Sequence, residues 1–113
     1  MTAFILLCKI IFMHVLADFV LQPSTMARLK NPNAIFLLHE SNFYPRWPVW
    51  MLAHAIVNAG LLYAVTHNIW LAAAEMVLHF TIDTMKCMQV LDPHADQQAH
   101  IMTKVIYWLI LIR

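Results

Sequence analysis

Long apolar stretches alternate with short polar connections along this chain, and the pattern predicts four helices. A helix that crosses a lipid bilayer needs about 20 predominantly apolar residues. Four stretches reach or approach that length, and they cover residues 3–22, 47–66, 69–90 and 94–113. Pro23 ends the first stretch and Asp92-Pro93 ends the third, whereas Pro48 opens the second at a position where helices tolerate proline. We therefore expect an all-α chain in which residues 1–113 form one domain.

The connections predict how these helices are arranged. Those after the second and third stretches are only a few residues long, so consecutive helices should lie antiparallel in a four-helix bundle. The connection at 23–46 is longer, and its apolar run at 34–38 predicts a short interfacial turn. The predicted architecture is a bundle of four transmembrane helices.

Composition supports a membrane location. Hydrophobic residues make up 62% of the chain and charged residues 12%, against roughly 45–50% and about 25% in soluble domains. The formal net charge is +1 and no basic stretch occurs, so nucleic-acid binding is not expected. Cys8 and Cys87 lie in apolar runs and are predicted to be small buried side chains. Membrane lipids are the expected surroundings, and the oligomeric state, including a homo-oligomer, is left open.

Lysine and arginine are unevenly distributed among the connections. Arg28, Lys30 and Arg46 lie in the first connection and Lys86 lies beside the third, while the second has none. Because cytoplasmic loops carry an excess of these residues, the first and third connections should face the cytoplasm. Both termini are then predicted on the non-cytoplasmic side.

Polar residues, most of them ionisable, recur at intervals of four inside all four apolar stretches. Residues four apart share one face of a helix, and an ionisable side chain at mid-bilayer costs about 2.5–3.5 kcal/mol. The four stripes are His14, Asp18 and Gln22; His54 and Asn58; Glu75, His79 and Asp83 with Lys86 close behind; and Asp96, His100 and Lys104. At a rise of about 1.5 Å per residue, each stripe places a histidine or aspartate about 9 to 12 Å from the loop end of its helix. The stripes are therefore predicted to meet at one depth, in the cytoplasmic half.

Two short similarities suggest an internal duplication. His14-x3-Asp18 parallels His79-x3-Asp83, and Ala53-His54 parallels Ala99-His100. The hypothesis is that two helical hairpins repeat about an axis along the membrane normal. It predicts a pseudo-symmetric site at the bundle centre.

The same motifs resemble those of a known family. They are His14-x3-Asp18-x3-Gln22, Ala53-His54, His79-Phe80-x2-Asp83-x2-Lys86 and Asp96-Gln97-x2-His100. In combination they resemble an uncharacterised integral-membrane family of bacteria and phages, known only as a domain of unknown function. Its members often carry a second histidine four residues after the one in the second helix, where this chain has Asn58. The resemblance implies a multi-pass protein of the bacterial inner membrane and implies no reaction.

One interpretation of the stripes is a site for a divalent metal ion. Imidazole and carboxylate ligands suit Zn²⁺ or another first-row metal, with Zn²⁺ the expected ion. The predicted ligands are His14, Asp18, His79 and Asp83, with His54 and His100 as further ligands or as partners of the ligands. With an open coordination position the ion would activate water, Glu75 would be the general base, and Lys86 would hold an anionic group such as a lipid phosphate. This predicts a metal-dependent hydrolase of a lipid or another amphiphile.

Two other interpretations remain open. The stripes could form a purely structural polar core, in which interhelical hydrogen bonds contribute about 0.6 kcal/mol each. They could also line a proton or metal-ion path, or a pore in an oligomer as in holin-like proteins. A path requires polar residues that continue to the far face of the bundle, whereas a structural core requires no metal ion.

Overall fold

The structure, a computed structural model, describes residues 2–32 and 47–113. Within these ranges all regular secondary structure is helical, with five α-helices, one π-helical turn and no strand, so the prediction of an all-α fold is confirmed there. The helices are α1 (Ala3–Val15), continued by the π-helical segment η1 (Leu16–Val20), α2 (Ser24–Leu29), α3 (Trp47–Thr66), α4 (Ile69–Cys87) and α5 (Pro93–Leu111). The interfacial turn predicted at 34–38, and Arg46, lie outside the described residues.

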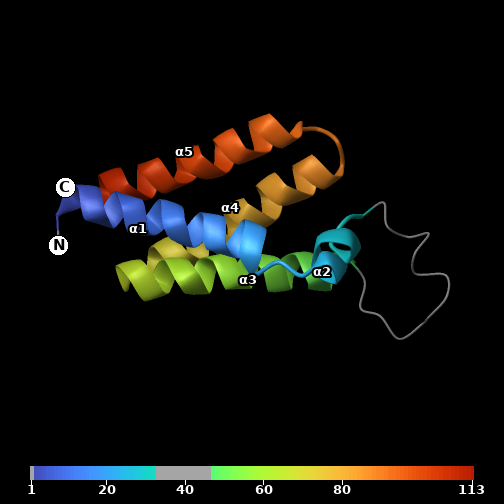
Figure 1. Cartoon of the computed structure of the whole chain (residues 1–113), viewed down its shortest axis with the longest axis horizontal. Helices are drawn as coiled ribbons and strands as arrows, with labels where there is room; N and C mark the ends of the chain where they lie inside the picture. The colour runs from blue at the N-terminus through green and yellow to red at the C-terminus, as the bar shows by residue number, and fades with distance from the viewer. Residues whose placement is uncertain (1, 33–46) are drawn as a thin grey trace.

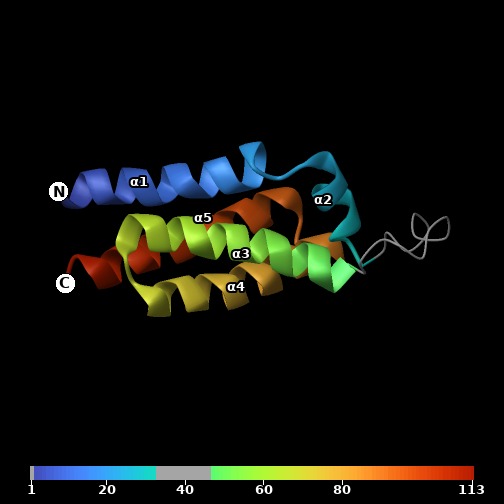
Figure 2. The same cartoon turned by 90° about the horizontal axis from the view of Figure 1, so that it is seen from below.

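The four long helices lie side by side and alternate in direction (Figures 1 and 2). Helix α1 packs against α3 and α5, and α4 packs against the same two helices, with the most extensive contact between α3 and α4. Both ends of the chain lie at one end of the bundle together with the α3–α4 turn. Helix α2 and the α4–α5 connection lie at the opposite end, which we call the loop end (Figure 1).

Side-chain caps explain why α4 and α5 begin where they do. The Asn68 side chain accepts hydrogen bonds from the backbone N–H groups of Trp70 and Leu71, at 3.0 and 3.1 Å. Asp92 Oδ1 accepts one from the Ala95 N–H at 2.7 Å, with proline as the next residue. Such caps satisfy backbone donors that a helix start leaves without a partner.

The observed helices differ from the predicted ones, and the last one covers Pro93–Leu111 rather than 94–113. The first helix ends at Val20 rather than at residue 22, and its last turn is π-helical. The third predicted stretch ends at Cys87 rather than at residue 90, and Gln89 there has a φ of 62°, which a continuing right-handed helix cannot accommodate. The short helix α2 was not predicted, because six residues carry too little periodicity to reveal a helix.

Polarity in the bundle is the reverse of that in a soluble domain. The buried polar and charged side chains are His14, Lys30, His54, Asn58, Glu75, His79, Asp83, Asp96, His100 and Lys104. Many large apolar side chains face outward instead, for example Phe12 at 63% exposure and Trp70 at 81%. Cys87 is buried as predicted, but Cys8 is exposed, because α1 turns Ile10 and His14 inward and Cys8 outward.

Two segments have the length and composition of a membrane-spanning helix, Ala3–Val20 and Trp47–Thr66. Helices α4 and α5 are nearly as long but less apolar, because their buried stripes carry more charge. The structure therefore supports two candidate spans, and a bundle with four spans stays a prediction.

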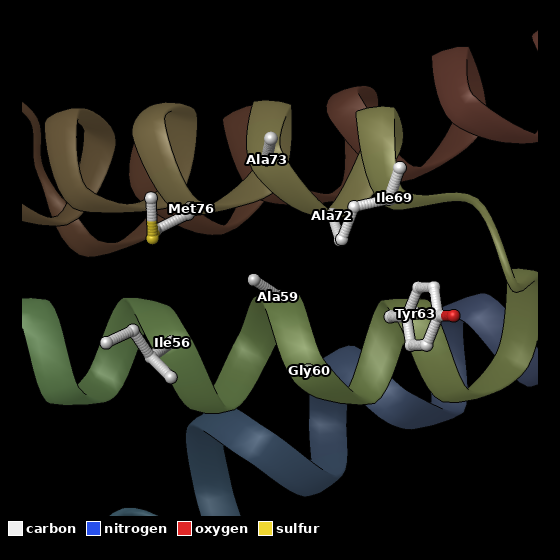
Figure 3. A pocket seen from close by; sticks show the side chains of 8 residues that line it. All are labelled: Ile56, Ala59, Gly60, Tyr63, Ile69, Ala72, Ala73 and Met76. Atoms are coloured by element: carbon white, nitrogen blue, oxygen red, sulfur yellow. The ribbon is translucent and has the colours of Figure 1, made fainter.

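An apolar groove runs along the outer surface between α3 and α4 (Figure 3). Its volume is about 350 Å³, and Ile56, Tyr63 and Met76 are among the side chains that line it. A methyl group added at Gly60 would meet no atom within 4 Å, so this glycine is not required for close helix packing. No residue of the buried polar stripes lines the groove.

Candidate metal centre

The four stripes come together along the bundle axis, where we call them the polar core. It consists of His14 and Asp18 from α1 and η1, Lys30 at the end of α2, His54 and Asn58 from α3, Glu75, His79 and Asp83 from α4, and Asp96, His100 and Lys104 from α5. Five helices thus contribute to one buried network. Burying so many polar groups is unfavourable unless each forms a hydrogen bond or an ion pair. The partners of each side chain therefore define the geometry of the site.

Asp18, His54 and His79 form the tightest group in this network. Asp18 Oδ1 lies 3.2 Å from His54 Nε2 and 3.4 Å from His79 Nε2. The two histidine Nε2 atoms are 3.0 Å apart. Two ligand atoms of a tetrahedral Zn²⁺ ion, each about 2.0–2.1 Å from the metal, lie about 3.3 Å apart. The three atoms therefore have the dimensions of one face of a zinc coordination tetrahedron.

The π-helical turn η1 carries Asp18 to this position. The Leu21 N–H donates to the carbonyl of Leu16, five residues earlier, at 2.8 Å, which widens the last turn of the helix. Single π-turns within α-helices are frequent at functional sites. Asp18 Oδ2 stays 3.6 Å from His14 Nε2, while Oδ1 faces the histidines of α3 and α4.

A second carboxylate orients His79. His79 Nδ1 lies 3.1 Å from Glu75 Oε1, and the Lys104 ammonium donates to the same oxygen at 2.7 Å. An ionised carboxylate can only accept hydrogen bonds, so Nδ1 carries a proton, while Nε2 faces Asp18 and His54. Metal-binding histidines are commonly held by a carboxylate in this way.

Asn58 supports the same group from α3. Its amide nitrogen donates to the carbonyl of His54 at 3.1 Å and to Asp18 Oδ1 at 3.5 Å. The nitrogen also lies 3.2 Å from His79 Nε2. The amide therefore touches every member of the triad and restricts their relative positions.

His14 and His100 extend the histidine cluster. The His79 and His100 rings stack with centroids 4.3 Å apart, and His14 lies 5.1 Å from His100. His14 Nε2 contacts Gln97 Oε1 at 3.2 Å. His100 Nε2 lies 3.2 Å from Asp96 Oδ1, whereas the Nδ1 atoms of His14 and His100 have no hydrogen-bond partner among the described residues. His14, His79 and His100 are near enough to one another to form a second candidate ligand set.

The aspartates nearest the loop end are paired with lysines. Lys30 binds Asp83 directly, and Lys86 Nζ lies 3.2 Å from Asp83 Oδ1 and 3.7 Å from Asp96 Oδ2. The Lys86 side chain is 31% exposed, so the network reaches the surface there. Asp83, Asp96 and His100 form a third candidate ligand set, but its two carboxylates already have cationic partners.

Charge balance distinguishes Asp18 from the other buried carboxylates. Glu75 pairs with Lys104, Asp83 with Lys30 and Lys86, and Asp96 with Lys86. In the part of the chain that the structure describes, the partners of the Asp18 carboxylate are histidines and Asn58, with no lysine or arginine among them. A cation at the triad would compensate this remaining negative charge.

The structure brings the predicted ligands together in combinations that the sequence motifs do not indicate. Asp18 and His79 come together as predicted ligands, and His54, expected as a further ligand, completes their triad. Asp83 pairs with Lys30 and Lys86, and its Oδ2 atom lies 3.4 Å from His54 Nε2, so its role as a ligand stays a prediction. The two His-x3-Asp motifs are therefore used differently.

Sequence analysis missed the part that Lys30 plays. It lies beyond α2, outside every apolar stretch, and was counted only as a loop charge. Lys104 was placed on a stripe but not assigned to Glu75. The helical period shows which residues share one face of a helix. It does not show how neighbouring helices are rotated relative to one another, so it could not predict contacts between residues of different helices.

The chain matches a family model over residues 6–113, and the description of that family is "protein of unknown function (DUF3307)". The chain belongs to the DUF3307 family. The resemblance to an uncharacterised domain is confirmed at that level, and the match includes every residue of the polar core. No curated protein and no solved structure matches the chain.

The polar core of this DUF3307 chain is bounded by an apolar cluster at the end opposite the loop end. Ile10, Leu62, Leu71 and Tyr107 are buried against one another there. Tyr107 lies one helical turn beyond Lys104, with its ring 5.9 Å from the lysine ammonium. The polar stripes thus end in hydrophobic packing inside the bundle.

Proposed function

We propose that this DUF3307 chain is an integral membrane protein whose polar core binds a zinc ion through Asp18, His54 and His79. We further propose that the ion serves hydrolysis of a lipid or another amphiphile. The observation that carries the proposal is the triad, whose three ligand atoms lie 3.0 to 3.4 Å apart.

The reversed polarity of the bundle supports a membrane location for all four long helices. In a bilayer, ionisable residues face the interior of a bundle and pair with one another, as they do in the polar core. Apolar side chains such as Phe12 and Trp70 then face lipid. By the distribution of Lys and Arg, the loop end is on the cytoplasmic side and both termini are on the other.

The number and kind of ligands support a catalytic type of zinc site. Structural zinc sites use four protein ligands, whereas catalytic sites use three and keep the fourth position for water or substrate. A zinc ion held in this way makes its water a nucleophile at neutral pH. Glu75 holds the proton on His79 Nδ1 and so keeps Nε2 available as a ligand.

Access to the centre is expected from the loop end. Lys86 is the partly exposed cation at the edge of the network, where it can attract an anionic group of the substrate. Glu75 lies on the opposite side of His79 and contacts Lys104. We therefore assign Glu75 to positioning His79, and its earlier interpretation as the general base stays a prediction.

Two observations favour this proposal over the alternatives. The cluster around Ile10, Leu62 and Leu71 closes the axis, which disfavours a continuous path through one chain. Within the described residues, the buried Nδ1 atoms of His14 and His100 lack hydrogen-bond partners, which a purely structural network would satisfy.

Metal content tests the proposal directly. Protein purified in detergent should contain about one zinc ion per chain by elemental mass spectrometry, and His54→Gln should remove it because three ligands are the minimum for such a site. His67→Gln is the matched control, since this histidine is exposed in the α3–α4 turn. A folded wild-type protein that stays free of zinc after incubation with the ion would refute the metal centre.

The same preparations test hydrolysis. Mixed micelles of phosphatidylethanolamine and phosphatidylglycerol should be cleaved by the zinc-loaded wild-type protein and not by His54→Gln. Products can be followed by phosphorus NMR and by fatty-acid release. Zinc-loaded protein that leaves ester and phosphoester bonds of both lipids intact would restrict the function to metal binding.

A further inference from the structure

A second cavity lies between α1 and α3, at the end of the bundle that holds the termini. Its volume is about 430 Å³, and it is lined by Lys9, Phe12 and Met13 of α1 and by Ala64, Val65 and His67 at and after the end of α3. None of these residues belongs to the polar core. The cavity is therefore separate from the proposed zinc site.

Lys9 is an unusual residue for its position. It lies within the apolar segment Ala3–Val20, and it is exposed rather than turned into the polar core. It has no hydrogen-bond or ion-pair partner among the described residues, whereas Lys30, Lys86 and Lys104 all bind buried carboxylates. A lysine on the outer surface of a membrane helix extends its ammonium group toward the headgroup region.

The lining of the cavity combines cationic and apolar groups. Lys9 supplies an ammonium group and His67 an imidazole that can donate a hydrogen bond, and no carboxylate is among the lining residues. Phe12, Met13 and Val65 supply apolar walls. Phosphate oxygens accept charge-assisted hydrogen bonds from such donors, while the walls suit the glycerol and first methylene groups of a lipid.

We propose that this cavity binds the phosphate group of an anionic phospholipid. The inference rests on the membrane location proposed above and not on the zinc site. Lys9 reaches the phosphate from within the membrane, and His67, in the turn that joins α3 and α4, contacts it from the interface. An apolar wall beside a cation favours a lipid over free phosphate, because free phosphate would leave Phe12 and Met13 without a partner.

Native mass spectrometry of the detergent-purified chain tests this site. The protein is titrated with dioleoyl phosphatidylglycerol, with dioleoyl phosphatidylcholine and with inorganic phosphate. Lys9→Gln should weaken phosphatidylglycerol binding about tenfold, the loss expected for one charge-assisted hydrogen bond. Arg28→Gln is the matched control, because Arg28 is an exposed cation in α2 at the other end of the bundle.

Each outcome decides the proposal. Preference for phosphatidylglycerol over phosphatidylcholine that is lost in Lys9→Gln and kept in Arg28→Gln would support it. Equal phosphatidylglycerol affinity of the wild type and Lys9→Gln would overturn it, and displacement of the lipid by inorganic phosphate would replace it with a free-phosphate site. Zinc content of Lys9→Gln should equal that of the wild type, so failure of this site and failure of the metal centre are separate results.

Discussion

At the scale of single residues, His79 connects the charged part of the core with the proposed metal site. Its Nδ1 atom contacts Glu75, its Nε2 atom faces Asp18 and His54, and its ring stacks on His100. Both ring nitrogens therefore have defined partners. The orientation of this ring depends on Glu75, whose charge is in turn stabilised by Lys104.

Replacing Glu75 by glutamine should lower zinc affinity by about 10- to 100-fold, the usual effect of losing a partner that orients a ligand. The substitution also leaves the buried Lys104 ammonium without its counter-charge, which lowers stability. The double variant Glu75→Gln/Lys104→Met should recover stability but not zinc affinity. Thermal unfolding and a zinc titration measure the two quantities, and an affinity that recovers together with stability would show that Glu75 is only structural.

At the scale of helices, the π-turn η1 decides where Asp18 lies. A regular α-helix would keep His14 and Asp18 on one face, four residues apart, and rotate the carboxylate relative to α3 and α4. The widened turn allows Asp18 to contact His54 and His79 while it remains near His14. A π-turn is equivalent to one extra residue in the helix.

Deleting Phe19 from η1 should therefore convert the turn to α-helix and remove zinc from the triad. Phe19 is exposed, so the deletion removes no core side chain. Deletion of Phe4, at the start of the same helix and also exposed, is the control and should leave zinc content unchanged. Circular dichroism checks that helicity persists, and a Phe19 deletion that keeps its full zinc content would contradict the role given to η1.

At the scale of the whole molecule, the bundle buries a charged polar core and exposes many large apolar side chains. A soluble protein rarely exposes so much contiguous apolar surface. In the proposed membrane location this surface would face hydrocarbon, where backbone groups must be paired within the helices.

This polarity leads to a prediction that separates a membrane bundle from a soluble one. Ile56 lies at the middle of α3 with 51% exposure, and Val49 lies near its start with 55% exposure. In a bilayer, Ile56→Asp should cost about 2.5–3.5 kcal/mol and Val49→Asp much less, because the cost depends on depth. In water, both surface substitutions should change stability by less than about 0.5 kcal/mol.

The amount of protein that remains in the membrane fraction after an alkaline carbonate wash measures this difference. We expect a marked loss for Ile56→Asp and little change for Val49→Asp. Equal behaviour of the two variants, or wild-type protein in the soluble fraction, would contradict the membrane location.

Sequence alone predicted the four long helices and the inward face of each, but not α2 or the π-turn η1. The limits 47–66 were predicted as observed, because an apolar run bounded by proline and polar residues defines a helix locally. The period of four identified the residues that become buried, including His14, His54, His79 and His100, because one face of a helix depends only on spacing.

Tertiary structure decided which of these residues become partners. It placed Asp18 with His54 and His79, gave Asp83 to two lysines, and brought Lys30 into the core from beyond α2. These choices depend on the rotation of each helix about its axis and on the extra residue in η1, and neither is encoded in the spacing within one helix. Local periodicity therefore predicts which side chains face inward, whereas packing between helices selects the atoms that meet.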